Sequence, residues 1–415
     1  MRATRRGLLA AALALPAIAR AQGPARVVVL GGGFGGASAA RRLRQIAPEV
    51  AVTLIERSAT YHACPFSNAV IAGLRDMAAQ EFTYGALAAD GVKVIAQAAT
   101  HIDATARRVI LADGGTVQYD RLILSPGIEL RFKDIAGYSD VAAGVMPHAW
   151  KAGPQTLLLR DRLAAVPDGG TVVMSVPGNP YRCPPGPYER ASLIAHYLKT
   201  HKPRAKLIVL DAKDAFSKQR LFQAAWKSLY PNLEWVGLSG GGKVVEVDAG
   251  SGTVKTEFAS YKADLANIIP PQRAGAIALV SDVADRTGWC PIDPVSFESR
   301  LQPGIHVIGD AAIAGGMPKS AFAANAQAKV CAQAVADLLA GRTPGEPRLI
   351  NTCYSIVAPD YGISVAGVYR PANGVLTDIE GAGGTSPLDA PPETRAEEAR
   401  YAESWFRTIT TEAFG

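Results

Sequence analysis

Two cysteines and a glutamate in this 415-residue sequence have the residue types and positions for thiol redox chemistry. Cys183 lies in a proline-rich loop between a predicted strand and a predicted helix, and Glu189 falls in the first turn of that helix. The dipole of a helix stabilises a thiolate near its N-terminus. Glu189 either carries protons, if burial raises its pKa, or complements the helix dipole. We therefore interpret this loop as a reactive site.

Cys353 is the second thiol candidate, in the segment 351–355. The sequence does not show whether it lies beside Cys183. If the two are neighbours, they form either a redox disulfide that an external sulfur nucleophile attacks or a purely structural disulfide.

Cys64 follows a strand that is predicted at 50–55. If this strand belongs to a dinucleotide-binding domain that holds a flavin, the chain after it passes close to the flavin ring. Cys64 could pair with another thiol near the flavin, or bond covalently to the flavin itself. Cys290 and Cys331 are expected to be buried free thiols. No CxxC pair and no metal-ligand spacing of the histidines occurs, so we expect no metal site and give His62 and His306 structural roles.

A dinucleotide fingerprint, Gly31, Gly33 and Gly36, directly follows a valine-rich predicted strand at 26–30. A helix at 37–45 and a second strand at 50–55 are predicted next. Such glycines give a tight turn, close approach of the backbone to pyrophosphate and contact between helix and strand. Glu56, at the end of the second strand, is placed to accept hydrogen bonds from ribose hydroxyls, and we assign Arg57 beside it to the same site.

Two later segments resemble the strand-end markers of FAD-dependent disulfide-reductase-like proteins. They are 119–127, which ends in Gly127, and 304–312, which contains Asp310. The resemblance implies that Gly127 belongs to the cofactor site and that Asp310 contacts the ribityl chain of the flavin.

A second βαβ unit is predicted from strands at 170–176 and 206–211 and a helix at 188–199, but it has no glycine fingerprint. The glycines at 240–242 precede a strand at 244–247, which we interpret as a hairpin loop. Without a second phosphate cradle, an NAD(P)H-linked reductase is the least favoured alternative. Electrons should therefore come from another donor, and the cysteines suggest sulfur.

These elements predict an α/β protein with two Rossmann-like domains of the FAD-dependent disulfide-reductase type and a smaller C-terminal domain. The expected FAD domain is discontinuous, at 24–140 and 280–345. The second Rossmann-like domain is expected at 146–279, and a C-terminal domain that caps the flavin or forms an interface at 346–415. A helix at 321–339 and a charged helix at 393–407 are also predicted.

Residues 1–21 have a basic start, a short apolar run and a small-x-small site, which is typical of a cleaved export signal. Its twin arginine, Arg5 and Arg6, favours Tat export to the periplasm, which suits a protein that binds its cofactor before export. The alternative is a Sec signal in which the two arginines are adjacent by chance. The segment carries four of the 43 basic residues, so the remainder has 39 basic and 37 acidic residues and a net charge of +2. This balance indicates no nucleic-acid partner, and no segment has the length and apolarity of a membrane span.

The chain after this signal resembles the flavoprotein subunit of flavocytochrome c sulfide dehydrogenase (the SoxF-like group), a relative of sulfide:quinone reductases. The motifs that carry the resemblance are CPFSN at 64–68, VIAG at 70–73, PYRCPPGPYERA at 180–191, MPKSAFAAN at 317–325 and NTCYS at 351–355. The residues that flank Cys64 differ from those of other family members. Lys319, in the fourth motif, is assigned to the cofactor site.

The resemblance implies that FAD is held covalently through Cys64, that Cys183 and Cys353 form the active disulfide, and that Glu189 assists protonation. It further implies that sulfide or a persulfide is the substrate and that electrons pass to a c-type cytochrome subunit or soluble cytochrome c. Any haem must reside on another chain, because no CxxCH motif occurs. A sulfide:quinone reductase-like enzyme and a non-catalytic flavin-binding accessory protein of a sulfur-oxidation system are the alternatives.

Overall fold

The computed structural model describes residues 23–415, so the predicted export signal lies outside the described residues. A five-stranded parallel sheet forms one half of the molecule, with strand order β20-β9-β1-β2-β5. The valines at 27–29 are buried on both faces of the sheet, as a central parallel strand requires. The strands are β1 (Arg26–Leu30), β2 (Ala51–Glu56), β5 (Lys93–Ala96), β9 (Arg121–Leu124) and β20 (Ile305–Val307).

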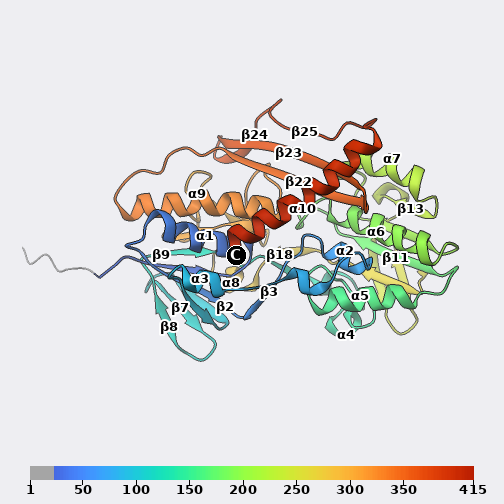
Figure 1. The fold of residues 1–415 in the computed structure, drawn as a ribbon. Coiled ribbons are helices and arrows are strands. Elements are labelled where there is room, and N and C mark those ends of the chain that lie inside the picture. Colours follow the sequence, from blue (N-terminus) through green and yellow to red (C-terminus); the bar gives the residue numbers. More distant parts are fainter. Residues whose placement is uncertain (1–22) are drawn as a thin grey trace, which may run out of the picture.

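A second parallel sheet, with order β13-β12-β11-β17, forms the other half of the molecule (Figure 1). Its strands are β11 (Thr171–Val176), β12 (Lys206–Asp211), β13 (Leu233–Val236) and β17 (Leu265–Ile268). The helices of this half are α5 (Pro154–Ala165), α6 (Gly186–His201) and α7 (Gln219–Leu229). The predicted strands and the helix between them are confirmed, while the domain limits expected from the sequence stay a prediction.

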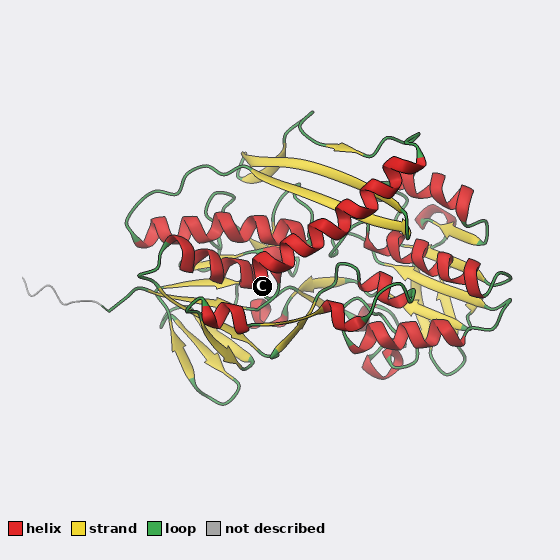
Figure 2. Ribbon diagram, viewed as in Figure 1, coloured by secondary structure: helices red, strands yellow, loops and turns green. Residues whose placement is uncertain are grey.

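The C-terminal part connects the two halves. β22 (Leu349–Ala358) and β23 (Tyr361–Ala372) form a long antiparallel hairpin, extended by β24 (Val375–Asp378) and β25 (Gly384–Thr385). β22 contacts α6 of one half and α9 (Ala321–Leu339) of the other. The last helix, α10 (Pro392–Phe414), runs across the molecule from the hairpin to α1 (Phe34–Ile46), and it continues beyond the predicted end at residue 407 (Figures 1 and 2).

Shorter elements complete the chain. They are β3 (Thr60–His62), α2 (Ser67–Ile71), η1 (Met77–Gln80), β4 (Glu81–Thr83), α3 (Gly85–Ala89), β6 (Ala99–Asp103), β7 (Arg108–Leu111), β8 (Thr116–Gln118), β10 (Ile128–Leu130), η2 (Phe132–Asp134), α4 (Asp140–Ala143), η3 (Leu238–Gly240), β14 (Val244–Asp248), β15 (Thr253–Thr256), β16 (Ser260–Lys262), β18 (Gln272–Ala274), α8 (Ala276–Val280), β19 (Cys290–Pro291), η4 (Gly309–Ala311) and β21 (Ala312–Ile313).

The interpretation of the glycines at 240–242 as a hairpin loop is wrong. They follow β13 through the short helix η3, and β14 pairs with β15 rather than with β13. A Cβ on Gly242 would lie 2.0 Å from the Val236 carbonyl oxygen, so glycine is needed for the sharp return of the chain. The edge strand β13 escaped the sequence analysis because it has only four residues, with a charged one among them.

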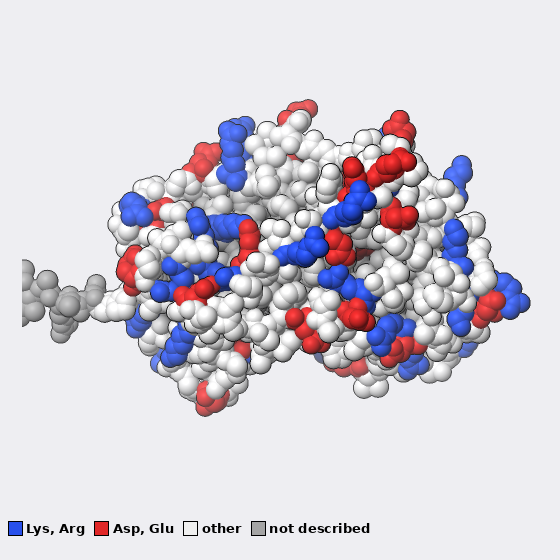
Figure 3. All heavy atoms as spheres, viewed as in Figure 1, with Lys and Arg blue, Asp and Glu red and all other residues white. Residues whose placement is uncertain are grey.

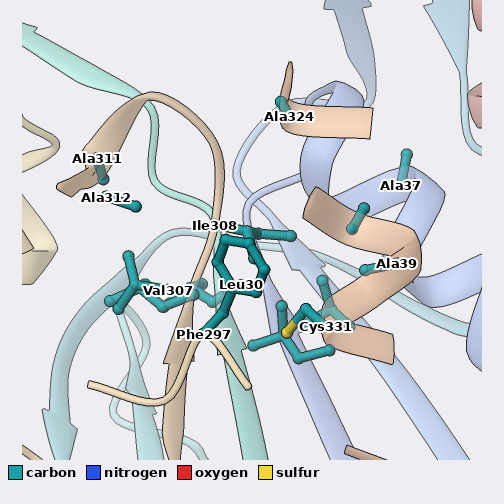
Figure 4. Close-up of a cluster of buried hydrophobic side chains, with 14 of the residues drawn as sticks. Leu30, Ala37, Ala39, Phe297, Val307, Ile308, Ala311, Ala312, Ala324 and Cys331 are labelled. Atoms are coloured by element: carbon teal, nitrogen blue, oxygen red, sulfur yellow. The ribbon is translucent and has the colours of Figure 1, made fainter. Parts of the chain in front are cut away.

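The half of the molecule that contains the five-stranded sheet has a core built from small and branched side chains. Cys331, on α9, is fully buried in the cluster that contains Leu30, Ala39, Phe297 and Ile308 (Figure 4). Its prediction as a core residue is confirmed.

Charges of both signs are interspersed on the face shown in Figure 3, without a continuous basic patch in that view. None of the helices within residues 23–415 combines the length and the apolarity needed to cross a bilayer.

Candidate active site

A cavity of about 770 Å³ lies where the two halves and the C-terminal part meet. Its wall combines the start of α1, the end of β2, the segment after β3, the loop before α6, and parts of β22 and α10. The predicted site residues that line it are Gly31, Gly33, Glu56, Arg57, Cys64, Gly127, Cys183, Glu189, Asp310 and Cys353. Gly36 and Lys319 do not line it. Residues far apart in sequence are therefore gathered in one space.

The glycine fingerprint shapes the end of the cavity at the N-terminus of α1. Gly31 has a φ of +102°, and a Cβ there would lie 2.2 Å from the Ser125 carbonyl oxygen. A Cβ on Gly36 would lie 1.8 Å from the Gly31 carbonyl oxygen, which explains why Gly36 serves the helix–strand contact rather than the wall. Gly33 caps α1, whose first turn has no acidic residue, so the helix presents free N–H groups and no opposing charge to a phosphate.

Glu56 lies beside this turn. One carboxylate oxygen accepts a hydrogen bond from the Gly32 N–H at 2.8 Å, and the other accepts from the Ser58 N–H at 3.1 Å. These bonds hold the carboxylate at the cavity wall, and its oxygens can still accept further hydrogen bonds. The arrangement fits the adenosine end of FAD, with Glu56 as the residue that would bind ribose hydroxyls.

Asp310 faces the cavity at the end of β20, in the short helix η4. Its Oδ2 lies 3.9 Å from an Arg182 nitrogen, whereas its buried Oδ1 has no hydrogen-bond partner among the described residues. Burial raises the pKa of Asp310. A buried carboxylate oxygen without a partner is suited to a ligand hydroxyl, as the predicted contact with a ribityl chain requires.

Lys319 lies behind the wall rather than in it. Its ammonium donates hydrogen bonds to the carbonyl oxygens of Asp310 at 2.8 Å and Ala312 at 2.7 Å, and it lies 4.0 Å from the centre of the Trp289 ring. Burial lowers its pKa to about 8. Lys319 thus fixes the backbone that presents Asp310 to the cavity.

Cys183 precedes α6 with a left-handed backbone, φ +57°. Its N–H donates to the Lys319 carbonyl at 2.7 Å, and its carbonyl accepts from the Gly186 N–H at 2.8 Å, so the strained turn is held at both ends. Burial raises the pKa of this thiol, and negative charge on Cys353 or Glu189 raises it further. Burial also outweighs the opposite influence of the Arg182 and Lys218 cations, so this thiol is held in its neutral form, contrary to the thiolate that we expected.

Cys353 lies in the middle of β22, with 8% of its surface exposed, and its sulfur accepts a hydrogen bond from the Asn351 side-chain nitrogen at 3.3 Å. It reaches the same cavity as Cys183 because β22 contacts α6. The two sulfurs are not bonded to each other in this structure, and their pairing stays a prediction.

Glu189 is held between two elements. One oxygen accepts from the Ile356 N–H of β22 at 2.8 Å, and the other accepts from the Asn68 side-chain nitrogen of α2 at 2.7 Å. Burial raises its pKa although both hydrogen bonds act in the opposite direction. A carboxyl group with a raised pKa at the wall of a cavity is suited to exchange protons with a bound ligand.

Cys64 lies between β3 and α2 and is partly exposed to the cavity. Its sulfur is 4.0 Å from the Trp150 carbonyl oxygen. The guanidinium of Arg182 also donates a hydrogen bond to this carbonyl oxygen.

Several site residues were missed by the sequence analysis. Arg190, 2% exposed, donates hydrogen bonds to Asn68 Oδ1, Asn267 Oδ1 and the carbonyl oxygens of His148 and Ala149. Arg190 lies within the motif at 180–191 and Asn68 within the motif at 64–68, so these motifs could have pointed to both residues. Their contacts depend on tertiary structure. Lys218, 8% exposed, donates to the Cys353 carbonyl, and no sequence pattern marks it.

Of the three remaining candidates, Cys290 and His306 lie outside the cavity lining. Cys290 is fully buried and free, and burial raises its pKa to about 12. His306 is fully buried with Nδ1 2.8 Å from the Ser296 carbonyl oxygen, and burial lowers its pKa to about 4. His62 lies 3.5 Å from Glu81 and lines the cavity, so its structural role stays a prediction. No group of three or more His, Cys, Asp or Glu side chains within residues 23–415 is arranged to hold a metal ion.

Comparisons with known families match three parts of the chain. Residues 156–270 match the model described as "Sulfide dehydrogenase [flavocytochrome c] flavoprotein chain, central", and residues 345–414 match "Flavocytochrome c sulphide dehydrogenase, flavin-binding". Residues 25–165 match "Pyridine nucleotide-disulphide oxidoreductase". The matched flavin-binding domain implies FAD as the cofactor.

Among curated proteins, the chain is similar to the sulfide dehydrogenase [flavocytochrome c] flavoprotein chain of Chlorobaculum thiosulfatiphilum. The two are 58% identical over 48 residues, which are 100% of that sequence and 12% of this chain. This chain is also 22% identical to the mitochondrial sulfide:quinone oxidoreductase of Mus musculus over 303 residues, which are 68% of this chain and 65% of that protein.

Solved structures with the same fold include the sulfide:quinone oxidoreductase of Aquifex aeolicus, with a TM-score of 0.73 and 16% identity over 94% of this chain and 92% of that chain. Putidaredoxin reductase in its covalent complex with putidaredoxin gives a TM-score of 0.68 and 17% identity over 92% of this chain and 93% of that chain. At these identities the likeness establishes the fold, which is the predicted α/β disulfide-reductase type.

Proposed function

Because this chain belongs to the flavocytochrome c sulfide dehydrogenase flavoprotein family, a family of oxidoreductases, we propose that it oxidises sulfide through a Cys183–Cys353 disulfide. The observation that carries the proposal is the meeting of both cysteines and Glu189 in the cavity that also contains the dinucleotide fingerprint. Bound FAD would supply the acceptor for two electrons and pass them singly to a c-type cytochrome, the partner that the family implies.

In the proposed reaction, hydrosulfide attacks one sulfur of the disulfide. A new S–S bond forms to the incoming sulfur, the Cys183–Cys353 bond breaks, and one cysteine becomes a persulfide while the other leaves as a thiolate. The raised pKa of Glu189 and its place at the wall support its role as the group that accepts and returns protons here.

Replacement of Cys353 tests the disulfide mechanism. Cys353→Ser should abolish sulfide-dependent reduction of cytochrome c, because serine cannot form the disulfide. Cys331→Ala is the matched control, since it removes a thiol from the core outside the cavity. Full turnover by Cys353→Ser would contradict the mechanism.

We further propose that Cys64 holds FAD covalently. Its place at the cavity wall, between β3 and α2, supports this assignment. Gly31, Gly33, Glu56, Arg57, Gly127 and Asp310 would hold the rest of the cofactor.

Export to the periplasm by the Tat route is also proposed, on the twin arginine at residues 5 and 6. The double variant Arg5→Lys, Arg6→Lys should stay in the cytoplasm in a fractionated host. Undiminished export of this variant would contradict the Tat assignment.

A sulfide:quinone reductase-like activity is the second candidate, and the relatives named above favour it. The packing of α10 supports the cytochrome instead. Two of its aromatic residues, Phe406 and Phe414, are buried, and Phe414 stacks on Tyr61 and Phe82, so this face of the helix is not available to a lipid surface. Tyr401, 55% exposed, is on the outer face of the helix, which also carries charged residues. Parallel assays with cytochrome c and a water-soluble quinone decide between the two acceptors.

A further inference from the structure

Lys218 is a buried lysine fixed against the strand that carries Cys353. It precedes α7 with φ +62°, a left-handed conformation uncommon outside glycine. Its ammonium donates hydrogen bonds to the Cys353 carbonyl oxygen at 2.8 Å, Ser355 Oγ at 2.8 Å and the Ile363 carbonyl oxygen at 3.3 Å. These acceptors belong to β22 and β23, so the position of the cation is set by the hairpin.

The ammonium lies among groups that become negative when they ionise. These groups are Cys353 on β22, Cys183 before α6, Glu189 on α6 and Glu398 on α10, and the influence of Cys353 is the largest. No ion pair of Lys218 occurs within residues 23–415, and burial lowers its pKa to about 8. Burial of a cation without a counter-ion costs free energy, and a thiolate on Cys183 or Cys353 would supply the missing negative charge.

The Cys353 sulfur has a polar neighbour on the same face of β22. Asn351 donates to this sulfur through Nδ2 at 3.3 Å, while its Oδ1 accepts from Ser320 Oγ at 2.6 Å. The Ser320 bond fixes the amide with its donor towards the sulfur. Asn351, Cys353 and Ser355 point to one face because side chains alternate along a strand.

We propose that Lys218 is a positioning residue of the Cys183–Cys353 pair, whose buried ammonium stabilises the negative charge released onto the pair when sulfide opens the disulfide. The inference rests on the proposed function. In that step the hydrosulfide sulfur supplies the electron pair of the new S–S bond, and the departing cysteine sulfur keeps the electron pair of the broken bond. The disulfide itself is the oxidant, so no further reactant is needed.

The pH dependence of alkylation of the reduced pair tests this role, because iodoacetamide reacts with thiolates. The purified flavoprotein is reduced, alkylated at a series of pH values, and digested for quantification of the Cys183 and Cys353 peptides. Lys218→Gln keeps a hydrogen-bond donor but removes the charge. Lys227→Met removes an exposed lysine from α7, the helix that follows Lys218, and is the matched control.

Loss of the Lys218 charge should move the alkylation midpoint of at least one cysteine to higher pH, with alkylation about tenfold slower below the midpoint. The Lys227→Met protein should behave as the wild type. An unchanged midpoint in flavin-loaded Lys218→Gln protein would overturn the inference. Lys218→Met supplies a second uncharged variant if Lys218→Gln does not fold.

The same preparations separate this inference from the proposed function. If peptide mapping of the oxidised wild type shows no Cys183–Cys353 bond, the proposed function fails. If the bond forms and the midpoint does not move in the Lys218 variants, only the role of Lys218 fails.

Discussion

Replacement of Glu189 by glutamine is the sharpest test of the buried carboxyl group. The two carboxylate oxygens accept from the Ile356 N–H and the Asn68 amide. Glutamine has one acceptor oxygen, so one of these buried donors would face an NH₂ group. An unsatisfied buried donor costs about 1–3 kcal/mol, and we expect Glu189→Gln to lose about that much unfolding free energy at mildly acidic pH.

The loss of unfolding free energy in Glu189→Gln, relative to the wild type, should become smaller as the pH rises. Burial raises the pKa of Glu189, so the stabilisation linked to its neutral form is fully present below the unfolded pKa of about 4.3 and is lost as the pH rises through the folded pKa. Glutamine does not titrate. Denaturant unfolding at several pH values should therefore show that the difference in unfolding free energy between the wild type and the variant becomes smaller above about pH 4. A difference that does not change with pH would refute this reasoning.

Turnover separates the two roles of Glu189. If it carries protons, sulfide-dependent turnover of Glu189→Gln should fall by about 100-fold or more, and the pH–rate profile should lose one ionisation. If it only complements the helix dipole, turnover should stay within a few-fold of the wild type. Wild-type turnover with an unchanged profile would refute the proton role.

Two further predictions concern the cofactor. Cys64→Ser should release its flavin on acid precipitation, whereas the wild type should keep it with the protein pellet; release from both would contradict the covalent link. Gly36→Ala should be purified without flavin, because its Cβ would meet the Gly31 carbonyl oxygen at 1.8 Å, a backbone contact that costs about 3 kcal/mol or more to relieve. Gly345→Ala, where the Cβ meets nothing within 4 Å, is the matched control, and normal flavin absorbance in Gly36→Ala would show that the fingerprint reasoning is wrong.

The parts of the fold with strong local patterns were predictable from the sequence. The strand at 26–30 and the helix at 321–339 agree with the structure residue by residue, because an unbroken valine run and a long alanine-rich stretch each favour one conformation. The hairpin of β22 and β23 was not predicted. Its residues alternate in burial against α9, α10 and α6, and this partnership is set by packing over long sequence distances.

The site was predictable only where a motif contained it. Cys183, Cys353 and Glu189 could be named, but their common cavity depends on the contact between β22 and α6. Lys218 could not be found, because three hydrogen bonds to a distant hairpin distinguish it from a surface lysine. The raised pKa of Cys183 was also not predictable, since it results from burial that the loop sequence does not reveal.

An anaerobic titration of the purified flavoprotein with sulfide tests the central claim most directly. We predict that the flavin absorbance bleaches in proportion to added sulfide, with an end point at equimolar sulfide and flavin. Because both electrons have then left the cysteine pair, the sulfur should be found as sulfane sulfur, either bridging Cys183 and Cys353 or released from the re-formed disulfide. A flavin that stays oxidised in excess sulfide would contradict the account and favour a non-catalytic flavin-binding accessory protein.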